Sequence, residues 1–271
     1  MSQTSTDSVL EIHTLPYNLL IRFLKFVSAL AHLTHQVFKG IFKSRIEFDL
    51  LVDQIFQIGI KSLPLIFVTT ASIGMVMALQ FGISLEKFGG KIYVPKVVSL
   101  SIIRELGPVF ASMMLAARVG SGMTSEIGSM VVTEQISAIR ALGTSPIQKI
   151  VIPRVLGCFI ALPILCVLAN LFGVVGGMVV GVNDLGLDLG FYLQKASQTI
   201  GMSDYISGIS KSFFFSFFIS IPACYYGLNI KGGTKGVGLS TTKSVVTACV
   251  LIMIGDYFLT KLFWVFETWL L

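Results

Sequence analysis

The sequence predicts an all-α, polytopic membrane protein with about five transmembrane helices, preceded by an amphipathic helix at the membrane interface. Hydrophobic residues make up 54% of the chain and charged residues only 13%, against roughly a quarter in soluble domains. The mean hydropathy is +0.84. Several charge-poor segments are long enough to cross about 30 Å of hydrocarbon. Because so little charge cannot cover a water-facing surface, lipid is the expected solvent for most of the chain.

The chain is expected to divide into residues 1–46, a tail with an interfacial helix, and residues 47–271, a five-span domain. Within 15–43, polar side chains recur at helical spacing and apolar side chains fill the remaining positions, which predicts a helix with one basic stripe. The stripe consists of Arg22, Lys25, His32, Gln36, Lys39 and Lys43. The alternative is a first transmembrane helix with charged ends.

Five apolar segments are predicted to span the membrane, and the first has no charged residue over its whole length. They are 62–85, 97–117, 150–182, 212–230 and 244–266. With the N-terminus in the cytosol, the inner segments carry twelve Lys or Arg residues and the outer segments four. This bias favours a cytosolic N-terminus, although Lys87, Lys91 and Lys96 lie in the first outer loop.

The remaining composition excludes several classes of function. The net charge of +6 comes from basic residues that flank apolar runs, so we expect no nucleic-acid partner. The four cysteines lie inside apolar runs and are expected to be buried hydrophobes, and no His-carboxylate cluster indicates a metal. The sequence contains no Walker A motif, HExxH or GxSxG, and the start of the chain lacks the pattern of a secretory signal. We therefore expect no cofactor and no catalytic site in this chain.

Arg104 and Glu105 interrupt the second predicted span. An Arg within a span costs a few kcal/mol or more unless it faces protein or water. Pro108 removes the backbone hydrogen bond that the Arg104 carbonyl would otherwise accept, which favours a kink. Adjacent side chains point about 100° apart on a helix, so the two charges cannot form one pair. The pattern indicates the wall of a polar cavity or, alternatively, a structural ion pair between Arg104 and another helix, for instance with Asp256.

The polar segment 118–149 is predicted to contain a short amphipathic helix from 134 to 142. Thr133 is the expected N-cap and Gly143 the expected C-terminal stop. Ile136, Ile139 and Leu142 form one apolar edge, which suits docking into a partner or a solvated connection. Elsewhere, two successive GxxxG steps predict close helix packing with no substrate role. Their members are Gly173, Gly177 and Gly181.

Several motifs together resemble the permeases of MCE-associated ABC lipid transporters, the MlaE family, over about residues 47–265. The residues that carry the resemblance are Gly74–Gln80, Arg104–Val109, Ala117–Gly122, Ser125–Gly128, Thr133–Ile136 and Ile152–Arg154. The resemblance implies a permease subunit, not an enzyme, in the inner membrane of a bacterium. The implied partners are a second copy of this chain, a cytosolic ABC ATPase that holds ATP and magnesium, an MCE-domain protein on the outer face, and phospholipid.

The resemblance also implies roles for individual residues. The helix at about 133–143 matches the coupling helix that contacts the ATPase, through Glu134, Gln135, Ile139 and Arg140. The residues expected around the lipid are Met77, Leu85, Arg104, Glu105 and Leu106, and the apolar side chain of Leu79 extends that wall.

Two other functions are compatible with the residues alone. One is an ion- or proton-coupled secondary transporter in which Glu105, Asp256 and Arg104 form a charge relay. The other is a membrane scaffold that transports nothing. Copurification of an ATPase separates the ATP-driven permease from both.

Overall fold

The computed structural model describes residues 21, 24–41 and 48–270, and every regular element in that part of the chain is helical. Five continuous helical runs are long and apolar enough to cross a membrane, which confirms the predicted fold class. These runs are Phe48–Glu86, Lys91–Val132, Ile147–Asn183, Met202–Leu228 and Gly233–Trp269.

The first three runs are each assembled from several helical segments. The first contains α2 (Phe48–Gly59), η1 (Ile60–Ser62) and α3 (Leu63–Glu86). The second contains η2 (Lys91–Tyr93), α4 (Val94–Ser101), η3 (Ile102–Leu106), α5 (Gly107–Leu115), η4 (Ala116–Gly120) and α6 (Ser121–Val132). The third contains η5 (Ile147–Val151) and α8 (Ile152–Asn183). The other two are α10 (Met202–Leu228) and α11 (Gly233–Leu270).

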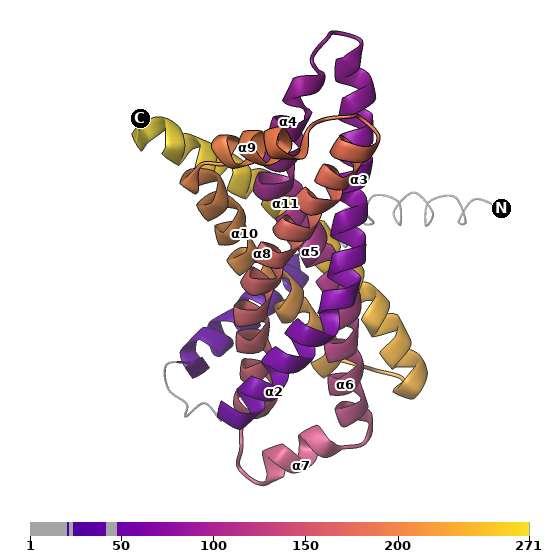
Figure 1. Cartoon of the computed structure of the whole chain (residues 1–271). Coiled ribbons are helices and arrows are strands. Elements are labelled where there is room, and N and C mark those ends of the chain that lie inside the picture. The colour runs from indigo at the N-terminus through magenta and orange to yellow at the C-terminus, as the bar shows by residue number, and fades with distance from the viewer. Residues whose placement is uncertain (1–20, 22–23, 42–47, 271) are drawn as a thin grey trace, which may run out of the picture.

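Two short helices mark the opposite ends of the bundle. Figure 1 shows α7 (Gln135–Ala141) at one end and α9 (Leu189–Thr199) at the other, with the C-terminus of α11 toward the α9 end. The chain reverses between α10 and α11 at Gly232 and Gly233, whose φ angles of 88° and 62° suit glycine. Asp188 caps α9 by accepting a hydrogen bond from the Phe191 amide at 2.9 Å.

The second span, predicted over 97–117, is longer in the structure. The helix does not stop near residue 117 but continues through α6 to Val132. Its charges have partners there: Arg118 donates to the Ser62 hydroxyl at 2.6 Å, and Glu126 pairs with Arg154 at 3.0 Å. Such pairing allows a charged helix to continue against its neighbours, which a count of charges along the sequence cannot reveal.

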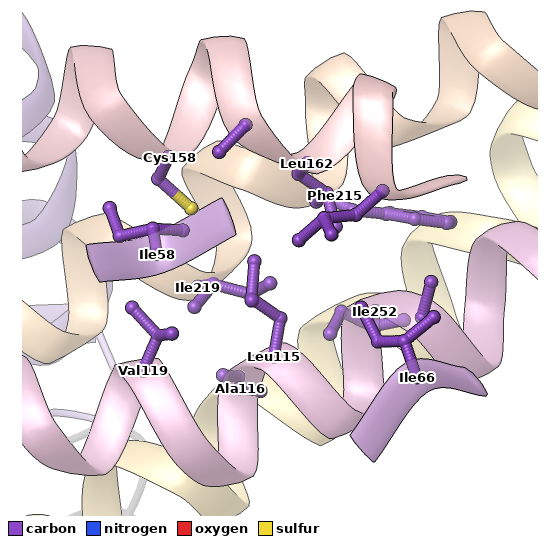
Figure 2. Close-up of a cluster of buried hydrophobic side chains, with 14 of the residues drawn as sticks. Ile58, Ile66, Leu115, Ala116, Val119, Cys158, Leu162, Phe215, Ile219 and Ile252 are labelled. Atoms are coloured by element: carbon purple, nitrogen blue, oxygen red, sulfur yellow. The ribbon is translucent and has the colours of Figure 1, made fainter. Parts of the chain in front are cut away.

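The core lies where all five runs meet. Figure 2 shows apolar side chains from the runs meeting in one cluster, with Ile219 beside Leu115 near its centre and Phe215 beside Leu162. Leu162 and Cys158 of α8 complete the same cluster. All four cysteines are free, and three of them are buried, as expected for small apolar residues. Several buried hydroxyls are satisfied within their own helix, as where Ser112 donates to the Pro108 carbonyl at 2.6 Å.

Residues 24–41 form a helix that packs against the α7 end of the bundle. Leu33 and Val37 are buried there in a cluster with residues of α6, α8 and α10. On the opposite side of the helix, Lys25, His32 and Lys39 are exposed. This helix is not among the five membrane-crossing runs of the described chain, so the alternative of a first transmembrane helix is not supported. Arg22 and Lys43, also assigned to the basic stripe, lie outside the described residues.

The α3–α8 pair packs with almost no side chain between the backbones. A Cβ added at Gly74 would overlap the Gly173 carbonyl oxygen. A Cβ at Gly177 would lie 3.1 Å from the Tyr192 hydroxyl, and one at Gly181 2.6 Å from the same ring. The glycine steps of α8 therefore allow α3 on one side and α9 on the other to approach closely. Burial raises the pKa of Tyr192 to about 12, so this phenol stays neutral at physiological pH.

Candidate functional site

The charged residues of the second run lie on η3, a π-helical turn between α4 and α5. Pro108 follows it and offers no backbone N–H, so the Arg104 carbonyl needs another donor. The side chains of Arg104 and Glu105 leave this turn toward different neighbours, as their adjacent positions on a helix require. The turn thus contributes one side chain to each of two separate ion-pair clusters.

Lys211 of α10 is the centre of the first cluster and has no solvent exposure. Its ammonium donates to the Arg104 carbonyl at 3.1 Å, to Glu105 Oε2 at 2.5 Å and to Thr260 Oγ1 at 2.7 Å. These three bonds use all three of its N–H groups. Asp256 Oδ1 lies 3.1 Å from the same nitrogen but receives no hydrogen bond. One buried cation therefore balances two carboxylates. It also donates a hydrogen bond to the Arg104 carbonyl, which Pro108 leaves without a backbone donor.

Arg104 is the centre of the second cluster. Its Nε lies 3.4 Å from Asp204 Oδ1, and its Nη2 donates to Glu267 Oε2 at 3.0 Å. The expected pair between Arg104 and Asp256 was therefore wrong, because Lys211 takes Asp256. The other half of that expectation was right, since Arg104 does tie three spans together.

From these two clusters, Arg104, Glu105 and Thr260 line a cavity of about 520 Å³, here called the deep cavity. Its other walls come from α4, α10 and α11, and it is open rather than enclosed. The lining residues are Leu100, Ser101, Arg104, Glu105, Ser207, Tyr257, Thr260, Lys261 and Trp264. The cavity has the size of an ordinary ligand site and combines apolar surface with a few charged groups.

The other residues expected around lipid lie elsewhere. Met77 and Leu85 of α3 pack against a buried cluster that includes Ala78 and Val98. Leu79 is partly exposed, and Leu106 lies at the end of η3 with intermediate exposure. None of these four lines the deep cavity, whereas Arg104 and Glu105 both do.

A second cavity of about 600 Å³ lies between α4 and α9 and is here called the α9 cavity. It shares Leu100 and Arg104 with the deep cavity, so the two adjoin. Its lining is more polar and consists of Ile92, Tyr93, Lys96, Leu100, Arg104, Lys195, Gln198, Thr199 and Asp204.

Sequence reasoning missed Lys211, Asp204 and Glu267 as members of these clusters. Lys211 lies directly before the predicted fourth span, 212–230, and so outside the residues expected to cross the membrane. The signal that could have identified it is Gly201, ten residues earlier, as an N-cap. A helix that starts at Met202 places Lys211 inside the span. Asp204 had the position of a helix cap, and its Oδ2 does accept from the Gly201 amide at 2.9 Å.

The short helix at the opposite end is close to its predicted position but begins differently. Thr133 does not cap α7, because its hydroxyl donates back to the Ser129 carbonyl at 2.8 Å. Instead the chain turns at Glu134, whose φ of 60° is left-handed and whose carboxylate accepts from Ser137. The end was predicted correctly: Gly143 has φ 74°, and the bonds Gly143 N–H to Arg140 O and Thr144 N–H to Ile139 O form a Schellman motif.

The predicted coupling residues divide between two faces of α7. Ile136 is buried and Ile139 partly buried against the chain's own core, so this edge is not available to a partner. Glu134, Gln135 and Arg140 are exposed, and Leu142 is 82% exposed beside them. The free surface of α7 and its flanks therefore mixes the charged residues Glu134 and Arg140 with small or polar side chains, and one large apolar residue, Leu142, lies at its end.

The sequence is similar to those of known membrane permeases. Residues 51–262 match the family model described as Permease MlaE. A probable ABC transporter permease protein of Rickettsia conorii is 39% identical over 90% of this chain and 94% of its own length. The corresponding protein of Synechocystis is 36% identical over 91% of this chain and 93% of its own length. The intermembrane phospholipid transport system permease protein MlaE of Haemophilus influenzae is 33% identical over 80% and 84%. With five membrane-crossing helices and a family match over most of its length, the chain belongs to the MlaE permease family and is a multi-pass membrane permease.

Proposed function

We propose that this chain is the transmembrane subunit of an ATP-driven transporter that moves phospholipid between the inner and outer membranes of a double-membraned cell. The observation that carries the proposal is the deep cavity, where Arg104, Glu105 and Lys261 meet the aromatic side chains of Tyr257 and Trp264. A phospholipid combines an anionic phosphate with long apolar chains, so its site needs both kinds of surface. Relatives named for ABC transport and for phospholipid transport support this assignment.

The charge arrangement suggests how such a site would receive a headgroup. Arg104 already has two carboxylate partners, so a phosphate would have to displace one of them, Asp204 or Glu267. Lys261 lines the same cavity, and no ion pair joins it to another described residue. Lys261 would therefore be the first cation to meet the phosphate, with Arg104 as a second contact. The roles of Met77, Leu79, Leu85 and Leu106 at the lipid chains are part of the same proposal.

The ATPase would bind at the α7 end. Glu134, Gln135 and Arg140 offer exposed charged and polar groups there, while Ile139 anchors the helix to the bundle, so a push on α7 would reach α6 and α8. The basic residues of the sequence are concentrated toward this end, which supports a cytosolic placement in the inner membrane. ATP and magnesium would belong to the ATPase chain. An MCE-domain protein would then meet the α9 end.

A second copy of this chain would pack against the exposed apolar face of the bundle. α11 contributes large exposed side chains, among them Phe258, Trp264 and Phe266. Only 17% of the residues in its apolar segment are buried within one chain. A face of this kind suits contact with lipid tails or with another copy. Cross-linking between cysteines introduced at position 258 in membranes measures whether the contact is between copies.

The test of function is transfer of labelled phospholipid between vesicles that carry the purified complex and acceptor vesicles. We expect transfer to require ATP and to stop when the nucleotide site of the partner ATPase is inactivated. A complex that contains no ATPase and no phospholipid would refute the proposal.

One observation favours a second candidate, an ion-coupled transporter. Two carboxylates, those of Glu105 and Asp256, share the single buried ammonium of Lys211, an arrangement that could exchange a proton. If an uncoupler stops transfer while ATP is kept constant, the energy comes from the ion gradient and the ATP-driven proposal is wrong.

A further inference from the structure

The α9 cavity has a larger excess of positive charge than the deep cavity, where Arg104 and Lys261 face Glu105. Lys96, Arg104 and Lys195 line the α9 cavity, against the single carboxylate of Asp204. Lys96 and Arg104 come from the adjoining segments α4 and η3, and Lys195 comes from α9, which is remote from them along the chain. Since like charges brought to one concave surface repel each other, their convergence costs energy unless an anion is bound there.

The only carboxylate in the lining is already engaged. Asp204 Oδ2 accepts from the Gly201 amide at 2.9 Å, and Oδ1 lies 3.4 Å from Arg104 Nε. Lys96 and Lys195 form no ion pair with any described residue. The Lys195 ammonium lies 5.8 Å from the centre of the Phe191 ring, a weak contact for an exposed lysine. Both lysines are therefore available to an incoming anion.

The two cavities share part of their lining, and this favours an anion that can occupy both. Leu100 and Arg104 face both, so an anion that leaves the deep cavity toward the α9 end passes Arg104 and then reaches the two lysines. Ile92 and Tyr93 add apolar surface at the rim, and both are more than half exposed. Cations and an apolar rim together match a phosphodiester that still carries its acyl chains.

We infer that the α9 cavity is a second binding site for the lipid headgroup. There Lys96 and Lys195 bind the phosphate of a phospholipid between the deep cavity and the α9 end. The inference rests on the proposed lipid transport and deepens it. Arg104 lines both cavities. While its guanidinium is bound to Asp204 and Glu267 it separates them, and when it binds phosphate instead it allows the headgroup to move from one cavity to the other. Lysine suits such a binding site, because its ammonium is a point charge on a flexible side chain and binds phosphate without fixing the orientation of the headgroup.

The test places a photoreactive benzoylphenylalanine at position 198 or at position 257 in the complete transporter complex. Position 198 lines the α9 cavity and position 257 the deep cavity. The probe is radiolabelled dihexanoyl phosphatidylglycerol, with inorganic phosphate at equal ionic strength as competitor. The test variant is K96Q/K195Q. The matched control is K87Q/K91Q, which removes the same charge from the same end at residues that do not line the α9 cavity.

We expect K96Q/K195Q to lower the cross-link at position 198 about tenfold and to leave the one at position 257 within about twofold, since charge-assisted contacts to phosphate are lost in one cavity only. The control should leave both positions within about twofold. Equal cross-linking at position 198 in all variants overturns the inference while the deep cavity still binds lipid.

Two further outcomes would also overturn it. If inorganic phosphate displaces the probe as well as unlabelled phosphatidylglycerol does, the cavity binds free phosphate. If K96Q/K195Q instead releases a protein partner with the cross-link at position 198 unchanged, the lysines form a protein interface. Failure of the unaltered complex to cross-link at either position refutes the lipid-transport proposal itself.

Discussion

Replacing Lys211 with methionine tests whether the buried cluster is what allows charge inside this bundle. Methionine keeps an unbranched apolar side chain but removes the ammonium, which has no solvent exposure and makes three hydrogen bonds at 2.5–3.1 Å. The change leaves the carboxylates of Glu105 and Asp256 facing each other without a cation, and it leaves the Arg104 carbonyl without a donor. Removing one partner from a buried ion pair costs about 3–5 kcal/mol.

The expected result is a large loss of thermal stability in the purified protein. For a chain of this size each kcal/mol lowers the Tm by about 2–4 °C, so the shift should be on the order of 10 °C. K243M is the matched control, because Lys243 lies exposed on α11. The triple variant with Glu105→Gln and Asp256→Asn removes both stranded charges and should recover at least about half of the lost stability, since neutral partners avoid most of the desolvation cost. A K211M protein that melts within about 2 °C of the unaltered chain would refute this account of the cluster.

Three other changes test the remaining contacts. Arg104→Ala should lower the yield of the complex and its bound phospholipid, and adding Asp256→Ala should not restore either, because these side chains do not pair; rescue by the double change would contradict the observed pairing. Gly177→Leu should cost about 1–3 kcal/mol or more by overpacking against α3 and α9, whereas Gly238→Leu, with open space around it, should change the Tm little. Glu134→Lys should reduce copurification of the ATPase with membrane insertion unchanged, and full copurification would remove α7 from the proposed interface.

The number and order of the membrane-crossing helices could be predicted from hydropathy alone. The resemblance to the MlaE permease family, read from the motifs around Arg104 and Glu126, is also confirmed by the family match over residues 51–262. Helix ends were less accurate. α6 continues past the predicted end of its span because Arg118 and Glu126 have partners on α2 and α8 that are remote in sequence. The helix α9 was not predicted, since its short, mixed sequence shows no clear apolar period.

The candidate site was predicted in part. The interruption by Arg104, Glu105 and Pro108 correctly indicated a cavity wall, because a charge within a span must face protein or water. Which groups would satisfy these charges was predicted wrongly. Asp256 was the expected partner of Arg104, and the actual partners are Asp204 and Glu267, from the start of one span and the end of another.

What the sequence determined by itself was therefore the set of constraints: five apolar runs, a charged kink in the second, glycine steps for close packing and a short helix between spans. Hydropathy and backbone chemistry act locally, so these follow from the order of residues. Only the tertiary structure decided how the constraints are met. Lys211, a residue at the edge of an apolar run, becomes the buried cation that satisfies the Arg104 carbonyl and balances Glu105 and Asp256. Its partners lie more than forty residues away along the chain, and ion pairing depends on distance in space, which only the packing of the helices sets.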